Sequence, residues 1–464
     1  MKKRWLSILV WILTISCCGA FSSCRGGAPG ESLQFQERLD EEGYTVIGIG
    51  TVSTVNIIIP HIYNFSPVVE IGGDAFREEM YLKSVTIPST VTRIGDFAFS
   101  ECSNLEKVNL GKGVQVIGMN AFANCSSLES ITIPDSVISV GWNAFSGCSG
   151  IKTLVIEDGV SGIDPSAFGH CINISEASAP AFAWSYIPKV NLEKAVITSG
   201  EAIHDKAFSG ATKLTSIDIP DSITMIGSLA FENCERLTNI KIPSGVVSIA
   251  NDAFKGCSAL TNISVAKNNP TYYSLDGNLY TKEDNVLMCY VGGKEETSFT
   301  IPDGVTKIGD AAFSDCDNLT SVSIPNSVTM IGASVFSDCD NLTSVILPNG
   351  MIRVGWSAYR YCDNLKNVEL PDTVTTLDYW CFSDCTSLTS VVIGDGMEAI
   401  GWGAFKGCEN LTAVYYKGSP SEWDEIAINH YNEALIEAMR YYYDESETAN
   451  CWWHYDENGV IVHA

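Results

Sequence analysis

The architecture of this chain can be read from residues 316–338, which run Cys316-Asp-Asn-Leu-Thr-Ser-Val-Ser-Ile-Pro-Asn-Ser-Val-Thr-Met-Ile-Gly-Ala-Ser-Val-Phe-Ser-Asp338. Cys339 follows directly and opens the same pattern again. Eleven of the 17 cysteines fall in runs with one constant 23-residue spacing: Cys102, Cys125, Cys148 and Cys171; Cys234 and Cys257; Cys316, Cys339, Cys362, Cys385 and Cys408. A repeat in the twenties with an aliphatic core predicts a leucine-rich repeat solenoid.

Each repeat is expected to contain one short parallel strand and an irregular or helical-turn return limb. The expected inward positions are Leu319, Val322, Ile324, Val328, Ile331 and Phe336. Val322 and Ile324 alternate with polar neighbours, as the buried side of a strand does. Pro325 is expected to end the strand, because proline has no N–H for the strand ladder. Gly332 is expected at a turn that requires a positive φ.

The register extends to repeats that lack the cysteine. Glu79 and Ala211 occupy the cysteine position after an Ala-Phe pair, so the solenoid is expected over residues 68–417 in about 13 to 15 turns. Two stretches are too long for single repeats, and we expect insertions near 172–206 and 266–297 that project from one edge of the stack. Asp276-Gly277 and the tyrosines between 272 and 290 predict a hairpin in the second.

A column of cysteines invites chemical interpretations that its geometry disfavours. A disulfide needs Cβ atoms about 3.8 Å apart, whereas parallel side chains in register keep the strand spacing of about 4.8 Å. A zinc site needs four ligands that converge on one point, and a catalytic thiol needs a base beside it. His170 is the only histidine near the column, and Ala211 keeps the volume without the thiol. We predict that the column packs the core, with no metal and no cofactor.

The chain carries a formal net charge of −27, with only 18% charged residues. Phosphate binding needs a basic face, so this charge argues against a nucleic acid partner. Cations, basic proteins and neutral glycans stay open as partners.

The amino terminus has the pattern of an export signal. Three basic residues in 1–4 precede an apolar run at 5–15, which is too short to span a bilayer. We expect a lipoprotein-type signal peptide at 1–23, followed by a tether at 24–40.

Residues 21–24, Phe-Ser-Ser-Cys, resemble a bacterial lipoprotein cleavage box, so Cys24 is the candidate lipid anchor. The phenylalanine departs from the usual aliphatic residue, which leaves Cys17, or ordinary cleavage near Ala20 or Ser22, as alternatives. The expected location is the cell surface, attached to a membrane through the lipid, with a secreted form as the second choice.

The motif Ile-Gly-x-x-Ala-Phe-x-x-Cys-x-x-Leu-x-x-Val-x-Ile-Pro recurs about a dozen times over residues 68–416. It resembles the 23-residue leucine-rich repeat of BspA-like bacterial surface proteins. Residues 43–64 resemble that family's amino-terminal cap, and residues 415–459 resemble a tail module of some members. The resemblance implies a cap at 41–67, a solenoid at 68–417 and a carboxy-terminal cap at 418–464. It also implies a surface-exposed binding or adhesion protein without enzymatic activity.

Three consecutive repeats carry an aromatic residue six positions before the cysteine. These are Trp356, Tyr379 and Trp402, and Trp380 lies close by in sequence. Aromatic residues on consecutive turns can stack on sugar rings or anchor a protein partner. Alternatively, the rings stack on one another and shield the edge of the coil, and Trp142 occupies the same position alone in an early repeat. We take Trp356, Tyr379, Trp402 and Trp380 as the candidate ligand contacts.

A column of acids follows the cysteine position: Asp317, Asp340, Asp363 and Glu409. Such oxygens can bind Ca²⁺, but no calcium-loop spacing is present, and Asp in a turn commonly bonds the backbone. The outward strand positions are mostly Ser, Thr and Asn, interrupted by Lys107, Lys241, Glu369 and Tyr415. We interpret most of that face as solvated scaffold.

The sequence therefore favours a surface protein that binds proteins or glycans of host or bacterial surfaces and does not bind nucleic acid. A carbohydrate-binding accessory protein is the alternative. An enzyme would have to use the tail, where Trp423, Trp452, Trp453 and His454 gather, but the segment 418–464 is short for an independent fold. The six histidines show no metal or triad spacing.

Overall fold

A computed structural model describes residues 32–39, 42–446, 451–456 and 459–463. The expected signal peptide and Cys24 lie outside the described residues. Those residues form a parallel-strand solenoid of about 17 turns of about 23 residues, with little helix, which confirms the predicted fold class. The solenoid divides into two units: one comprises residues up to 151 together with 159–171, and the other comprises 152–158 and the residues from 172 onwards.

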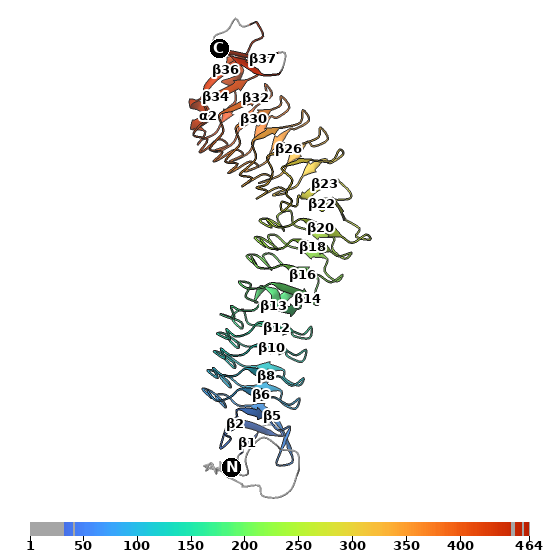
Figure 1. The fold of residues 1–464 in the computed structure, drawn as a ribbon, viewed down its shortest axis with the longest axis vertical. Helices are drawn as coiled ribbons and strands as arrows, with labels where there is room; N and C mark the ends of the chain where they lie inside the picture. The colour runs from blue at the N-terminus through green and yellow to red at the C-terminus, as the bar shows by residue number, and fades with distance from the viewer. Residues whose placement is uncertain (1–31, 40–41, 447–450, 457–458, 464) are drawn as a thin grey trace, which may run out of the picture. The chain divides into compact units, whose positions relative to one another are not determined.

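The first unit contains eleven strands in its described part, coloured blue to green in Figure 1. They are β1 (Gln34–Glu37), β2 (Tyr44–Gly48), β3 (Asn56–Ile58), β4 (Ile62–Tyr63), β5 (Ser66–Ile71), β6 (Ser84–Thr86), β7 (Arg93–Ile94), β8 (Lys107–Asn109), β9 (Val116–Ile117), β10 (Ser130–Ile133) and β11 (Ser139–Val140). Each regular turn contributes a longer strand, such as β8, and a two-residue strand, such as β9. The longer strands form one parallel ladder and the two-residue strands form another.

The amino-terminal segment is more ordered than predicted. The expected tether at 24–40 is too long, because β1 lies within it and pairs antiparallel with β2. Phe35 on β1 stacks on Tyr63 with ring centroids 3.9 Å apart. The chain is therefore fixed to the amino-terminal cap by Gln34.

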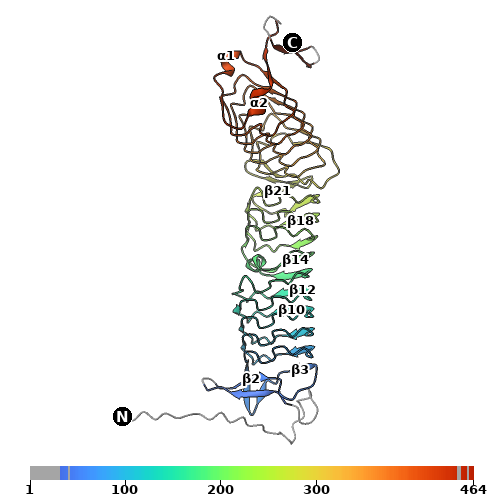
Figure 2. The ribbon, with the colours of Figure 1, turned by 90° about the vertical axis from the view of Figure 1, so that its left-hand side faces the viewer.

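The described part of the second unit contains the remaining strands and three short helices, and α1 and α2 are labelled in Figure 2. Its strands are β12 (Thr153–Ile156), β13 (Glu176–Ala179), β14 (Lys194–Ile197), β15 (Ala202–Ile203), β16 (Ser216–Asp218), β17 (Met225–Ile226), β18 (Asn239–Ile242), β19 (Ser248–Ile249), β20 (Asn262–Val265), β21 (Tyr272–Leu275), β22 (Asn278–Thr281), β23 (Val286–Cys289), β24 (Ser298–Thr300), β25 (Lys307–Ile308), β26 (Ser321–Ser323), β27 (Met330–Ile331), β28 (Ser344–Ile346), β29 (Arg353–Val354), β30 (Asn367–Leu370), β31 (Thr376–Leu377), β32 (Ser390–Ile393), β33 (Ala399–Ile400), β34 (Ala413–Tyr416), β35 (Ala427–Ile428), β36 (Met439–Tyr443), β37 (Trp452–Tyr455) and β38 (Ile461–His463). The helices are η1 (Ala181–Ser185), α1 (Pro420–Trp423) and α2 (Glu433–Glu437).

The core of each unit is built from columns of equivalent positions. In the first unit, Phe76, Phe99, Phe122, Phe145 and Phe168 stack with neighbouring centroids 4.9 to 5.5 Å apart. In the second, Tyr290, Phe313, Phe336, Tyr359, Phe382 and Phe405 form the corresponding column at 4.9 to 5.5 Å. These rings are almost fully buried. Rings within a column are held between equivalent rings of the turns before and after, so burial and stacking both depend on the 23-residue register.

The cysteine column is confirmed as packing, with an added hydrogen bond. Ten of the eleven cysteines donate their thiol to the carbonyl oxygen of the phenylalanine or tyrosine 26 residues earlier, at 2.9 to 3.4 Å. Burial raises the pKa of Cys102 to about 12, so this thiol stays protonated and can donate at neutral pH. All cysteines of the described residues are free.

The three other positions of the column lack this thiol hydrogen bond, and their surroundings indicate where cysteine is used. Glu79 lies in the first regular turn, and Ala211 follows the short turn that contains η1. Cys316 follows the hairpin turn, and its thiol donates to the Ser314 carbonyl instead, at 3.8 Å. Cysteine is therefore retained where the preceding turn is regular, with Cys316 as the exception that lacks this bond.

The segment 172–206 forms a turn rather than the expected projection. Strand β13 pairs in parallel with β12 and with β14, and Glu176 faces Lys194 after a turn shorter than the regular repeat. Trp184 in η1 is fully buried and its ring lies 4.7 Å from that of Phe208. The larger indole thus fills the interior of the shortened turn and extends the ring column that continues from Phe208.

The segment 266–297 contains the predicted hairpin, which is confirmed. Strands β21 and β22 pair antiparallel, and β22 pairs antiparallel with β23. Asp276 and Gly277 both have positive φ, at 50° and 79°, as a two-residue hairpin turn requires. Strand β23 then resumes the parallel ladder with β25.

Gly332 was expected to need a positive φ, and this prediction is wrong. The positive φ values of this turn occur at Ser334 and Asp338, at 53° and 61°. A Cβ atom on Gly332 would lie 2.3 Å from the Asp310 carboxylate and 2.8 Å from its backbone nitrogen. Glycine is needed there because the preceding turn packs against the backbone.

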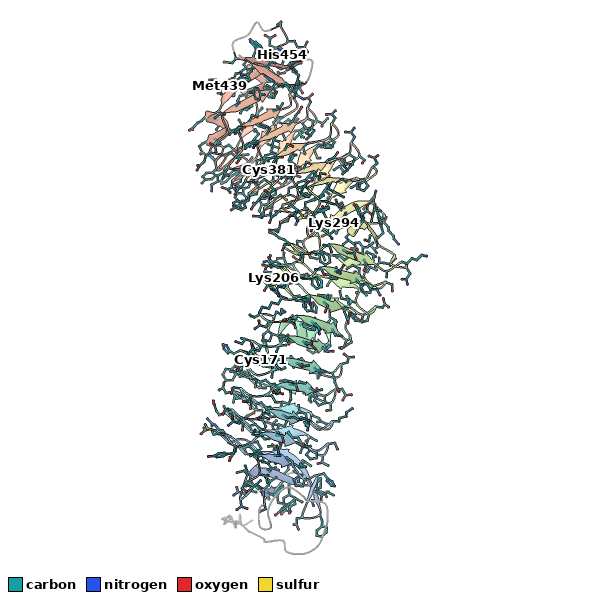
Figure 3. The ribbon with its side chains drawn as sticks, viewed as in Figure 1. Cys171, Lys206, Lys294, Cys381, Met439 and His454 are labelled. Atoms are coloured by element: carbon teal, nitrogen blue, oxygen red, sulfur yellow. The ribbon has the colours of Figure 1, made fainter. Side chains whose placement is uncertain are left out.

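The tail continues both ladders. Strand β36 pairs with β34, and β35 pairs with β33. Trp423 and Leu435 are buried in the same core as the last regular turns. Met439 and His454, labelled in Figure 3, mark this part of the chain. No helix among the described residues is long and apolar enough to cross a membrane.

Candidate binding surface

The candidate ligand residues lie at the corner that follows each two-residue strand. The third residue after the strand has a positive φ, and its N–H donates to a carbonyl of the next turn. Ser357 donates to the Tyr379 carbonyl at 2.9 Å and Trp380 to that of Trp402 at 3.0 Å. Gly403 donates to the carbonyl of His430 at 2.9 Å. The backbone of the corner is therefore fixed from turn to turn.

The second residue after the strand forms an exposed row. The pairing of β29, β31, β33 and β35 places Trp356, Tyr379, Trp402 and His430 at equivalent positions of four consecutive turns. The side chains of Trp356, Tyr379 and Trp402 are 48%, 55% and 44% exposed. Single exposed apolar residues are common, but a contiguous exposed apolar area usually marks a binding site.

The third residue after the strand forms a neighbouring row of alternating size: Ser357, Trp380, Gly403 and Tyr431. A Cβ atom on Gly403 would lie 2.7 Å from the Trp380 ring, so the glycine makes room for the indole. Trp380 and Tyr431 have φ values of 55° and 66°. Bulky residues rarely adopt this region, but the equivalent corner has a positive φ in other turns as well, such as 58° at Phe97 and 53° at Leu229, so this conformation belongs to the repeat.

Ring contacts connect the two rows. Trp356 lies 6.0 Å from Trp380, and Trp402 lies 5.7 Å from both His430 and Tyr431. Within these four turns, which the structure describes fully, no ring contact joins Trp356, Tyr379 and Trp402 directly. Trp356 nevertheless packs on Trp380, so the alternative that the rings of this surface pack on one another stays a prediction.

Two cations complete the surface. The Arg360 guanidinium lies 4.4 Å from the centroid of the Tyr361 ring and 5.9 Å from that of Trp380. The Lys406 ammonium lies 5.9 Å from the centroid of the Tyr431 ring. Such cations over aromatic faces are attracted by the ring quadrupole. We call the set Trp356, Arg360, Tyr361, Tyr379, Trp380, Trp402, Lys406, His430 and Tyr431 the aromatic patch.

Sequence reasoning found the four candidate residues and missed the rest of the patch. Trp356, Tyr379, Trp402 and Trp380 all lie in it, whereas Cys24 lies outside the described residues. His430 and Tyr431 were missed because the last turn, from Ala399 to its partner Ala427, is longer than the regular repeat. The usable signal was the position two and three residues after the aliphatic residue that ends each short strand.

The tail contacts Glu369 and Tyr415, two of the residues that interrupt the mostly Ser, Thr and Asn outward face of the strands. The Tyr455 hydroxyl donates to the Glu369 carboxylate at 2.7 Å. The Trp453 ring lies 5.6 Å from that of Tyr415 and donates its N–H to the carbonyl of Tyr416 at 2.9 Å. The hairpin β37–β38 thus covers Glu369 and Tyr415, which anchor the tail.

The acidic column after the cysteines forms no metal site among the described residues, where no group of three or more His, Cys, Asp or Glu side chains could hold an ion. Burial, and then repulsion by Asp340, raises the pKa of Asp317. Burial likewise raises the pKa of Asp340, with Asp363 as the next cause. The column is therefore a set of mutually repelling turn residues.

Comparisons with known proteins agree with this architecture. A sequence model described as "BspA type Leucine rich repeat region" matches residues 69–183, 175–275 and 289–412 in six copies. A leucine-rich cell surface protein from Faecalibacterium prausnitzii is 30% identical over 88% of this chain and 98% of its own, with a TM-score of 0.52. A leucine-rich repeat protein from Bacteroides ovatus is 24% identical over 89% of this chain and 98% of its own, with a TM-score of 0.48. A comparison with curated proteins found no match. The chain belongs to the BspA-type leucine-rich repeat family.

Proposed function

We propose that this protein is a lipid-anchored cell-surface receptor that binds surface proteins or glycans through the aromatic patch and has no enzymatic activity. The observation that carries the proposal is the exposure of Trp356, Tyr379 and Trp402 on consecutive turns. Residues of this type dominate the centres of binding interfaces. The similarity to a leucine-rich cell surface protein supports the location.

The backbone around the patch is fixed in the same way as in other turns of the solenoid, such as that of Trp142. Each carbonyl of the exposed row accepts a hydrogen bond from the turn before it, as Trp402 does from Trp380 at 3.0 Å. A rigid row binds without ordering its backbone, which removes part of the entropy cost of association.

The first experiment compares a double variant with a single-variant control in the soluble mature chain. Trp356→Ala with Trp402→Ala is expected to lower binding to intact cells and mucus glycoproteins at least 100-fold, with a melting temperature within about 2 °C of the parent. Trp142→Ala is the matched control, because Trp142 is 54% exposed at the same position of a turn in the first unit. Undiminished binding of the double variant would exclude the patch as the contact surface.

The lipid anchor is tested separately on the full chain. Cys24→Ser is expected to release the protein from the membrane fraction into the medium. The substituted residue has no thiol to carry the acyl chain that would hold the protein at the membrane. Cys17→Ser is the control, and release by Cys17→Ser alone would move the anchor to that residue.

A further inference from the structure

We infer that the aromatic patch binds a linear anionic polysaccharide in which an acidic sugar alternates with a neutral one. This inference rests on the proposed function, since it names the partner of the same surface. It is carried by an arrangement of rings and cations that occurs twice along the patch.

The first copy lies on the turns of β29 and β31. Trp356 contacts Trp380 of the next turn, with centroids 6.0 Å apart. The Arg360 guanidinium lies 5.9 Å from the centroid of the Trp380 ring. One copy therefore consists of an exposed indole, a ring of the next turn and a cation near the face of that ring.

The second copy lies on the turns of β33 and β35. Trp402 contacts Tyr431 of the next turn, with centroids 5.7 Å apart. The Lys406 ammonium lies 5.9 Å from the centroid of the Tyr431 ring. The three elements of the first copy therefore recur with nearly the same distances.

The two copies are separated by two repeats, because Trp402 and Lys406 occupy the positions of Trp356 and Arg360 two turns later. The buried rings of these turns are 5.2 to 5.5 Å apart, which is the rise of one turn. The patch thus offers one exposed ring per turn and one cation per two turns, with a period of about 10 Å at the strand spacing.

A polymer that matches this pattern has one flat monomer for each turn of the solenoid and an acidic group on every second monomer. Extended chains of pyranose sugars advance by nearly one turn of this solenoid per sugar, and their C–H faces stack on aromatic rings. An alternating acidic sugar would place one carboxylate beside each cation. The pattern matches a disaccharide repeat.

The charged side chains of the aromatic patch differ in sign from the net charge of the chain. The net charge of −27 leaves cations, basic proteins and neutral glycans as partners, yet Lys406 forms no ion pair with any described acid. Arg360 lies 3.5 Å from the Asp384 carboxylate, and both are about one third exposed, so Arg360 can be shared with a ligand. Arg353 is already bound by both oxygens of Asp378. Lys406 therefore carries the unpaired positive charge of the patch, and Arg360 shares its charge with Asp384.

The same pattern is poorly matched by other polymers. A single-stranded nucleic acid carries a phosphate on every nucleotide and binds strongly basic grooves. An extended peptide repeats side chains of one face every two residues, about 6.6 Å, which corresponds to neither one turn nor two. These polymers serve as comparison ligands.

The test uses the soluble mature chain and titration calorimetry at low and high salt. The ligands are oligosaccharides of hyaluronan, chondroitin and heparosan, in which acidic sugars alternate, with oligogalacturonate, dextran and oligothymidylate for comparison. We expect binding of the alternating glycans at least 10-fold tighter than of the others. Affinity should rise at least 10-fold from disaccharide to tetrasaccharide, which spans both copies, and change less than 2-fold beyond hexasaccharide.

Variants separate the two parts of the arrangement. Arg360→Gln with Lys406→Gln should lower affinity for the alternating glycans at least 10-fold at low salt and remove most of its salt dependence. Trp142→Ala should leave affinity unchanged. Equal binding of dextran, or unchanged affinity in the double cation variant, overturns the inference.

The failure of the inference can be told apart from that of the proposed function. If no glycan of the panel binds while Trp356→Ala with Trp402→Ala still abolishes cell binding, the partner is a protein and only the inference falls. If the double tryptophan variant binds cells normally, the proposed function falls as well.

Discussion

The turns that carry Trp142 and Trp402 share one backbone and differ in what surrounds the tryptophan. In the first unit the Trp142 carbonyl accepts from Asn120 at 2.9 Å, as that of Trp402 accepts from Trp380 in the second. Both indoles are about half exposed. Yet Trp142 follows Met119 in its row, whereas Trp402 follows Tyr379. The backbone of the turn is therefore the same, and the two turns differ in the residues of their surface columns.

The largest expected effect separates core from surface within a single turn. Phe405→Ala should lower the free energy of unfolding by about 3 to 5 kcal/mol, because its ring is fully buried and stacks on Phe382. Trp402→Ala, three residues earlier, should cost less than about 1 kcal/mol and abolish binding. Chemical denaturation of both variants measures the difference. A cost for Trp402→Ala as large as that of Phe405→Ala would place that ring in the core.

The second prediction concerns the thiol column. Cys125→Ala should lower the free energy of unfolding by about 1 to 2 kcal/mol, since it removes a buried sulfur and its bond to the Phe99 carbonyl. Ala211→Cys should bring no gain, because the turn before it is the short one with η1. Denaturation in the presence of reductant measures both. Stabilisation by Ala211→Cys would show that volume alone selects cysteine.

These two columns were predictable because they repeat. The 23-residue period indicated the register and the strand positions, and local turn residues indicated the hairpin after Tyr272. The short turn was not predictable, since Trp184 replaces phenylalanine and no cysteine follows at the usual distance. Interruptions of a repeat carry no periodic signal.

The candidate site was predictable only in part, for the same reason. Trp356, Tyr379 and Trp402 share the 23-residue period, so their row was visible. Tyr431 lies in a longer turn, and its contact with Trp402 depends on strand pairing rather than spacing. The docking of Tyr455 on Glu369 joins residues 86 positions apart, and nothing local in either segment indicates it.

The third prediction concerns Trp380, which has a positive φ at the corner of its turn. Trp380→Asn should raise the free energy of unfolding by about 0.5 kcal/mol, because asparagine tolerates positive φ better than tryptophan. The same change should weaken ligand binding at least 10-fold. Asn120→Trp, at the equivalent corner of the first unit, should cost about 1 kcal/mol. A clear loss of stability in Trp380→Asn would mean that the ring serves the fold more than the ligand.

The smallest expected effect distinguishes the acidic column of the second unit from its neutral counterpart, where Ser126 follows Cys125. Burial, followed by neighbouring carboxylates, raises the pKa of Asp317 and Asp340 in the folded state. A raised pKa means that the protonated form favours the fold. This stability is complete below the ordinary Asp pKa and is lost as pH rises through the raised values. The contribution of these two carboxyls to stability should therefore increase as pH falls from 7 towards the ordinary Asp pKa, and Asp317→Asn should stabilise the protein by a few tenths of a kcal/mol at pH 7 and not at pH 4. Ser126→Asp, which has only serines at the matching positions of its neighbouring turns, should show a weaker pH dependence. Destabilisation by Asp317→Asn at pH 7 would instead indicate that the carboxylate is held by a favourable partner, such as a bound cation.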